Sequence, residues 1–241
     1  MLKNSCIFFT VKITVVCLTF LLLILSLSLW CHLLLAKQNS SSVFLAQTVD
    51  LYVLDAGHGG RDGGAVSDQG LTEKEMNLSV TKKLRDYLIL CGAETVMTRE
   101  TDSLVCDEED PALKGKLKIT DLKNRLEIAE AYPSARFISI HMNKFSVEKY
   151  SGMQIYYSKN NAESKVLASQ TQERISTILQ PTNTRKVKAA GSNIFLLDRL
   201  QIPAVLIECG FLSNIAEAER LSQKDYQIQM SVLIADSLLA N

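Results

Sequence analysis

Three short apolar runs constrain the fold of this 241-residue chain more than any other feature. They cover residues 51–54, 137–140 and 204–207. Apolar runs of this length, bounded by turn residues, are typical of buried β-strands. Segments with a helical spacing of apolar residues separate the runs. Such alternation predicts an α/β fold with a mostly parallel sheet.

Apolar periodicity and turn residues predict the remaining elements. Helical spacing predicts helices over residues 76–91, 119–129 and 162–179, and either two short helices or one bent helix over residues 216–239. Alternating or short apolar segments predict further strands over residues 94–97, 152–157 and 193–197. The charged stretch 99–116 contains Pro111 and Gly115 and is expected to be a surface loop. We therefore predict a single three-layer α/β domain, in which a mostly parallel twisted sheet is flanked by helices.

The amino-terminal region predicts one membrane helix before this domain. Residues 13–36 are almost wholly apolar, and Lys3 and Lys12 precede them. The segment could cross a bilayer core of roughly 30 Å, and its basic flank is typical of a signal peptide or signal anchor. No clean cleavage site follows, so we expect an uncleaved anchor; either interpretation places the rest of the chain outside the cytoplasm. The predicted organisation is an anchor over 1–37, a linker over 38–48 and a folded domain over 49–241.

Charge and cysteine content argue against two other kinds of protein. The 26 basic and 26 acidic residues leave no basic excess, so a nucleic-acid partner is not expected. Three of the six cysteines lie in or beside the apolar amino-terminal segment, which leaves Cys91, Cys106 and Cys209. An odd number at irregular spacing does not predict a disulfide framework, and no Cys-x-x-Cys pair suggests a thiolate zinc site. Cys91, at the end of a predicted helix, is expected in the core.

Four polar residues are placed where a site would form. His58, His141 and Glu208 each follow a predicted strand, and Glu73 lies in the first turn of the helix after a glycine-rich loop. Ligands in open α/β sheets bind beyond the carboxyl ends of strands, so we expect these residues to converge. Two imidazoles and one carboxylate are the ligands of many catalytic zinc sites. The pattern therefore predicts a zinc site formed by His58, Glu73 and His141.

Glu208 would then be the proton-transferring group. A catalytic zinc ion activates water near neutral pH, and a second carboxylate must move the proton to the leaving nitrogen. Glu208 suits this role because an apolar strand precedes it, and burial would raise its pKa.

Structural roles remain open for the same residues. Glu73 could simply favour the positive end of a helix, and the two histidines could be hydrogen-bonded residues at strand ends. Glu208 could pair with a surface cation. Asp55 could orient His58 or cap the turn, and Arg125 is expected to be a solvated or packing residue.

Four sequence segments resemble the zinc-dependent N-acetylmuramoyl-L-alanine amidases of the type-3 amidase family. They are residues 55–60 (DAGHGG), 73–78 (EKEMNL), 139–143 (SIHMN) and 203–214 (PAVLIECGFLSN). The resemblance runs from about Leu51 to the carboxyl end. It implies that His58, Glu73 and His141 bind zinc and that Glu208 is the catalytic carboxylate. It also implies that the domain over 49–241 hydrolyses the amide bond between N-acetylmuramic acid and L-alanine in peptidoglycan.

Within this family, the chain is most similar to the germination-specific amidases of spore formers. The likeness rests on the short architecture, on the insertion over 101–118 and on the segments 183–186 and 194–197. It implies action on spore cortex peptidoglycan, where removal of peptide stems precedes muramic-δ-lactam formation. The expected location is extracytoplasmic, in the intermembrane space of the developing spore. An accessory protein for activation or zinc retention is compatible with this interpretation.

Other functions compete with this one. A zinc peptidase or carboxypeptidase acting on wall peptides could use a similar ligand set. A division or autolytic amidase would share the chemistry but not the spore role, and a degenerate relative could bind the wall without activity. A two-carboxylate glycosidase using Glu73 and Glu208 would leave both histidines unexplained.

Overall fold

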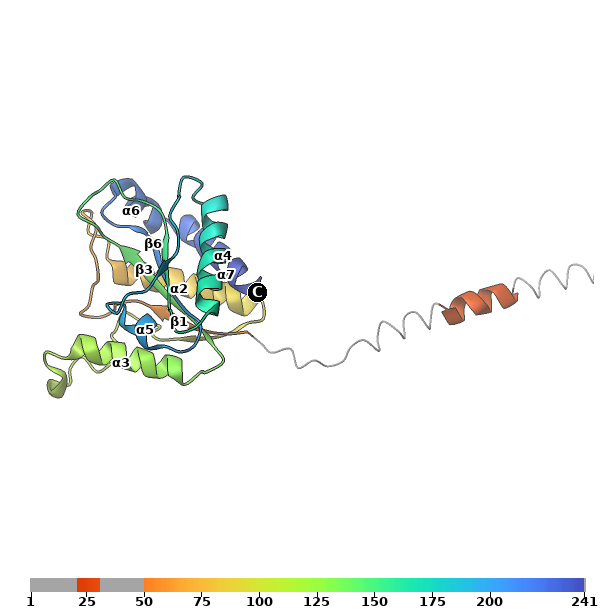
Figure 1. The fold of residues 1–241 in the computed structure, drawn as a ribbon, viewed down its shortest axis with the longest axis horizontal. Helices are drawn as coiled ribbons and strands as arrows, with labels where there is room; N and C mark the ends of the chain where they lie inside the picture. The colour runs from red at the N-terminus through yellow and green to blue at the C-terminus, as the bar shows by residue number, and fades with distance from the viewer. Residues whose placement is uncertain (1–20, 31–49, 241) are drawn as a thin grey trace, which may run out of the picture. The chain divides into compact units, whose positions relative to one another are not determined.

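The computed structural model describes residues 21–30 and 50–240 (Figure 1). Residues 21–30 form a helix in the unit Met1–Thr48, and Val49–Asn241 is a second compact unit. Among the described residues, no helix is both long and apolar enough to cross a membrane. Most of the predicted anchor over 1–37, and all of the linker over 38–48, lie outside the described residues.

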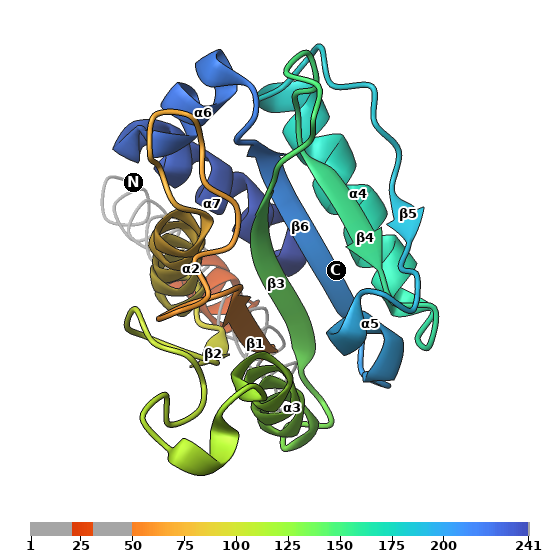
Figure 2. The same cartoon turned by 90° about the vertical axis from the view of Figure 1, so that its left-hand side faces the viewer.

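A six-stranded sheet organises the second unit (Figure 2). Its strands are β1 (Leu51–Ala56), β2 (Glu94–Met97), β3 (Arg136–Asn143), β4 (Gln154–Tyr157), β5 (Lys188–Ala189) and β6 (Ala204–Phe211). The spatial order is β2-β1-β3-β6-β4-β5. Every neighbouring pair is parallel except β4 and β6, which are antiparallel. The prediction of a mostly parallel sheet is confirmed.

Helices cover both faces of this sheet. They are α2 (Glu73–Leu90), α3 (Leu117–Glu130), α4 (Glu163–Ile178), α5 (Phe195–Arg199), α6 (Ile215–Ser222) and α7 (Lys224–Leu239). Alternate residues of a strand point to opposite faces. Leu54 and Ile138 therefore pack with α2, α4 and α7, whereas Val53 and Phe137 pack with α3 and α5. The predicted three-layer arrangement is confirmed, with an apolar cluster on each side of the sheet.

The two strands that carry site residues are longer than predicted. β3 continues to Asn143 and β6 to Phe211, so His141 and Glu208 lie within strands rather than after them. The two residues are register partners in the β3–β6 ladder, and that pairing extends both strands. Gly210 belongs to β6, where a Cβ would lie only 2.9 Å from Cδ of Glu217.

Two other predictions were wrong. Residues 193–197 were expected to form a strand, but Phe195–Arg199 form helix α5, and the edge strand is the two-residue β5. A short apolar run does not by itself distinguish a strand from a buried helix. This run packs against the second face of the sheet through Leu196 and Leu197. Cys91 was expected in the core, but it is the C-cap of α2 and is exposed.

A buried ion-pair network connects α3 to the end of β1. Arg125 is 1% exposed, and its side chain pairs with Asp55 at 2.6 Å and with Asp121 at 2.8 Å. Asp55 also accepts hydrogen bonds from the hydroxyls of Thr98 and Ser139. Burial is the largest influence on Asp55 and opposes its ionisation, but the charge of Arg125 and the hydrogen bonds from Ser139 and Arg125 together outweigh it and lower the pKa of Asp55. Of the two expected roles for Arg125, solvated or packing, the structure shows the second, because the side chain is buried in this network.

Replacement of Arg125 by alanine should lower the free energy of unfolding by about 3–5 kcal/mol, because Asp55 and Asp121 would remain buried without their cation. Urea unfolding of the variant and the parent protein measures the difference. The control is Arg174→Ala on α4, whose ion pair with Asp236 is half-exposed and should contribute at most about 1 kcal/mol. Equal losses in the two variants would contradict a structural role for the network.

Candidate functional site

The backbone around His58 is held in a strained but well-supported conformation. His58 has φ 62, the one positive value at a non-glycine residue in the described part of the chain. Arg125 Nη2 donates to the His58 carbonyl over 2.8 Å, so the network below the loop also fixes this residue. At Gly57 a Cβ would lie 2.2 Å from Nε2 of His141, so only glycine lets the loop pass this close to that imidazole.

His58, Glu73 and His141 converge on one point, as the sequence pattern predicts. Glu73 Oε1 lies 3.2 Å from His58 Nε2 and 2.9 Å from His141 Nδ1. One ligand atom from each residue lies within 4.8 Å of the others, and the two rings meet edge to face with centroids 5.0 Å apart. This donor set fits a zinc ion with a fourth position open for water or substrate.

The carboxylate of Glu73 is fixed by its surroundings. Its Oε2 accepts a hydrogen bond from the Ala65 N–H at 2.8 Å, and its Oε1 accepts one from the Met142 N–H at 3.1 Å. Burial alone would raise the pKa of Glu73, but hydrogen bonds from His141 and His58 outweigh it and lower that pKa. Glu73 is therefore an ionised, buried ligand candidate. A merely favourable charge at a helix end would not need these contacts.

Asp62 is a site residue that the sequence analysis missed. Its Oδ2 lies 2.9 Å from His58 Nδ1, although the two atoms are not aligned for a directional hydrogen bond. Burial would lower the pKa of His58, but the carboxylates of Asp62 and Glu73 outweigh it and raise that pKa to about 9. A carboxylate beside a metal-binding imidazole orients the ring and favours one tautomer. The spacing of four residues from His58 within a glycine-rich loop was the only signal in the sequence.

The predicted orienting role of Asp55 differs from what the structure shows. Asp55 reaches His58 through Arg125, which binds both the Asp55 carboxylate and the His58 carbonyl. The residue that lies against the His58 ring is Asp62.

Glu208 lies beside His141 and faces the same cavity as the two histidines. Its Oε2 is buried and has no hydrogen-bond partner among the described residues. Burial raises the pKa of Glu208 to about 7, and the charge of Glu73 acts in the same direction. A carboxyl group with such a pKa can both accept and donate a proton near neutral pH.

The cavity in front of Glu208 has a volume of about 440 Å³. Its walls come mainly from α3, α5 and the strand ends, and they include Lys118, Leu122, Asn143, Phe145, Tyr156, Asn193, Ile194 and Phe195. A volume of this size is typical of ligand sites with mostly apolar walls and a few polar groups. The four predicted site residues are thus brought to one edge of the sheet, three around the candidate metal position and one facing the cavity beside it.

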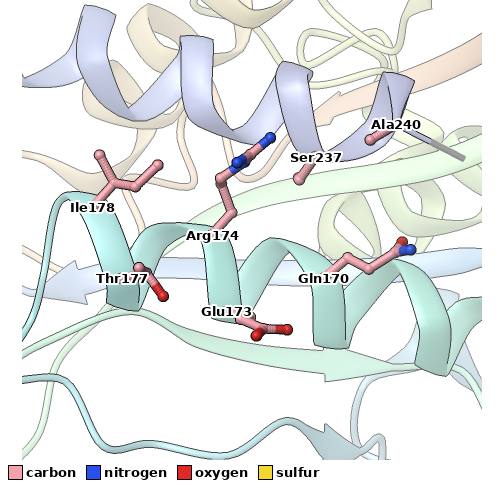
Figure 3. Close-up of a pocket in the computed structure, with 7 residues that line it drawn as sticks. All are labelled: Gln170, Glu173, Arg174, Thr177, Ile178, Ser237 and Ala240. Atoms are coloured by element: carbon pink, nitrogen blue, oxygen red, sulfur yellow. The ribbon is translucent and has the colours of Figure 1, made fainter.

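A second groove, between α4 and α7, contains no such chemistry (Figure 3). It is lined by Gln170, Glu173, Arg174, Thr177, Ile178, Ser237 and Ala240. These residues belong to helices that cover the sheet, or lie just beyond them, and none is a histidine or a cysteine. The groove therefore offers neither the two-histidine ligand set nor a carboxylate like Glu208 beside it, as found at the strand ends.

Comparisons with known proteins support the same interpretation. A family model described as N-acetylmuramoyl-L-alanine amidase matches residues 53–240. The germination-specific N-acetylmuramoyl-L-alanine amidase of Bacillus subtilis is 38% identical over 186 residues, which is 77% of either chain.

Solved structures show the same fold. The CwlD amidase from Clostridioides difficile, solved in complex with the GerS lipoprotein, is 38% identical and superposes with a TM-score of 0.76 over 79% of this chain and 97% of that one. The amidase AmiC2 of Nostoc punctiforme is 29% identical, with a TM-score of 0.67 over 79% of this chain and 96% of that one. The family match covers nearly all of the folded unit, and the chain therefore belongs to the N-acetylmuramoyl-L-alanine amidases, which act on peptidoglycan.

Proposed function

We propose that the protein is a zinc-dependent amidase in which His58, Glu73 and His141 hold the metal and Glu208 transfers the proton. The observation that carries this proposal is the convergence of the three ligand candidates beside a buried carboxyl oxygen without a partner. When bound, zinc supplies Lewis acidity and activates water at neutral pH. The substrate bond is the amide between N-acetylmuramic acid and L-alanine.

The residues of the chain account for the remaining steps. Ionised Glu208 accepts a proton from the attacking water, and protonated Glu208 donates it to the nitrogen of the departing L-alanine. Its pKa of about 7 makes both forms accessible near neutral pH. Asp62 keeps the His58 ring oriented, and the hydrogen bonds to Glu73 keep that carboxylate in place.

We also propose a role in the spore cortex, where the enzyme would remove peptide stems ahead of muramic-δ-lactam formation. Support comes from the similarity to the germination-specific amidase of Bacillus subtilis. In this proposal, residues 1–37 anchor the protein in a membrane, 38–48 are a linker, and 49–241 are the catalytic domain in the intermembrane space of the developing spore. The similarity to the CwlD amidase, which was solved with a lipoprotein, supports an accessory lipoprotein partner here too.

The protein should bind about one zinc ion per chain, and His58→Ala or His141→Ala should remove it, because two ligands hold a zinc ion far less tightly than three. Metal analysis after dialysis against a weak chelator measures the occupancy. Glu73→Gln should also lose zinc, whereas Glu173→Gln in the α4–α7 groove, a matched change far from the strand ends, should retain it. Full occupancy in either histidine variant would show that the ligand assignment is wrong.

Glu208→Gln should retain zinc but cleave cortex peptidoglycan at least roughly a hundredfold more slowly, because the amide cannot accept the proton. Mass analysis of the released fragments identifies peptide stems with a free L-alanine amino group and gives the rate. Zinc content is measured on the same preparation, so a metal defect is recognised. Turnover within a few-fold of the parent protein would refute the proposed role of Glu208.

The same substitution should change how stability depends on pH in the metal-free protein. The folded-state pKa of Glu208 is raised from 4.5 to about 7, so the stability that its protonated form contributes is complete below pH 4.5 and is lost as the pH rises towards 7. The stability of Glu208→Gln relative to the parent should therefore increase by about 3 kcal/mol between pH 4.5 and 7.5. Urea unfolding at both pH values measures this, with Glu219→Gln on the exposed side of α6 as the control. A pH-independent difference would contradict the raised pKa.

A further inference from the structure

A smaller pocket adjoins the cavity of the candidate metal site on the side of β4 and β5. It has a volume of about 220 Å³ and is lined by Asn143, Phe145, Tyr150, Gln154, Tyr156, Arg185, Lys188 and Phe211. Asn143, Phe145 and Tyr156 line both hollows. The two hollows therefore share walls, and a substrate at Glu208 could extend past Tyr156 towards Arg185. We call the smaller hollow the Arg185 pocket.

Arg185 is oriented by its neighbours and forms no direct ion pair in the described part of the chain. Its Nε donates to the Ser151 carbonyl at 3.0 Å, and its guanidinium carbon lies 4.6 Å from the ring centroid of Phe211 and 5.7 Å from that of Tyr150. These contacts fix the plane of the guanidinium group. Within the described part of the chain, neither Arg185 nor Lys188 forms an ion pair with a carboxylate. The pocket thus offers an oriented cation and a second, exposed one. Neither has a direct ion pair among these residues, although the charge of Arg185 also acts on Glu217, where it partly offsets the rise in pKa that burial causes.

The segment that carries both cations is attached to the sheet. The side-chain oxygen of Asn183 accepts a hydrogen bond from the Arg185 N–H at 3.1 Å. Gln154 Nε2 donates to the Lys186 carbonyl at 2.8 Å, and Lys188 is part of β5. The two cations are therefore presented by ordered backbone beside β4, as a binding site requires.

Tyr156 lies between the Glu208 cavity and the Arg185 pocket and interacts electrostatically with a residue of each. Burial raises the pKa of Tyr156, the charge of Glu208 raises it further, and the charge of Arg185 lowers it. The charges of Glu208 and Arg185 therefore both act on the Tyr156 hydroxyl. Tyr156 lines both hollows, so a peptide that runs past this residue from Glu208 enters the Arg185 pocket.

We infer that the Arg185 pocket binds a carboxylate of the peptide stem while the muramoyl–alanine amide lies beside Glu208. This inference rests on the proposed function. The peptide that departs from the scissile bond carries free carboxylates, whereas the N-acetylated sugars around that bond are uncharged. A guanidinium group binds a carboxylate through two parallel hydrogen bonds, and such charge-assisted bonds are about twice as strong as neutral ones.

The test uses two soluble muramoyl-peptides that differ only in their second residue, whose α-carboxyl group is either free (D-isoglutamate) or amidated (D-isoglutamine). The parent enzyme should cleave the free-acid substrate with roughly tenfold higher kcat/KM. Arg185→Gln should abolish this preference by raising KM for the free acid, with kcat and the amidated substrate nearly unchanged. Lys186→Gln, the same charge change at an exposed neighbour that does not line the pocket, should retain the preference.

Several results would overturn the inference. Arg185→Gln could retain the preference, or it could slow both substrates equally, which would indicate a general electrostatic effect and not recognition of the stem carboxylate. A loss of preference in Lys186→Gln would also indicate a general electrostatic effect. Calorimetric binding of the dipeptide L-alanyl-D-isoglutamate tests the pocket without turnover, and Arg185→Gln should weaken it roughly tenfold. Failure to cleave either substrate, with dipeptide binding intact, would count against the proposed function and not against the pocket.

Discussion

The buried guanidinium of Arg125 is the interaction on which the site depends. It joins Asp55 at the end of β1 to Asp121 on α3, and it also donates to the carbonyl of His58. A buried cation is costly unless its charge and its hydrogen bonds are satisfied, and here two carboxylates and two backbone carbonyls satisfy it. The same contacts hold His58 in a left-handed conformation that a side chain seldom adopts. Arg125 thus links the stability of the fold to the orientation of a ligand candidate.

The order of the central strands then brings the other groups to the same place. β1, β3 and β6 are parallel neighbours, so their carboxyl ends lie at one edge of the sheet. His141 and Glu208 are register partners on two of these strands, and the loop after β1 delivers both His58 and the start of α2 with Glu73. Gly57 allows the close approach of the His141 ring. The site is therefore a consequence of strand order and not of any one segment.

The surroundings of Glu73 and Glu208 push their pKa values in opposite directions. Glu73 accepts hydrogen bonds from two backbone amides and lies against two imidazoles, so its pKa is lowered. Glu208 has an oxygen without a partner, and burial raises its pKa to about 7. Two carboxyl groups in one site with separated pKa values can take different roles, one as a permanent anion and the other as a proton carrier. In the proposed mechanism, this division lets Glu73 bind the metal while Glu208 exchanges protons.

The sequence by itself determined most of the strands and long helices, the mostly parallel sheet and the placement of His58, Glu73, His141 and Glu208 at its edge. Apolar periodicity and turn residues are local signals, and strand ends that carry polar residues follow from them. The tertiary structure decided the rest. Arg125 is buried because Asp55, 70 residues away in the chain, lies opposite it. The run at 194–197 became α5 because it packs on a sheet face, and the Arg185 pocket exists because three distant segments meet. Such contacts join residues far apart in sequence, so no local pattern records them.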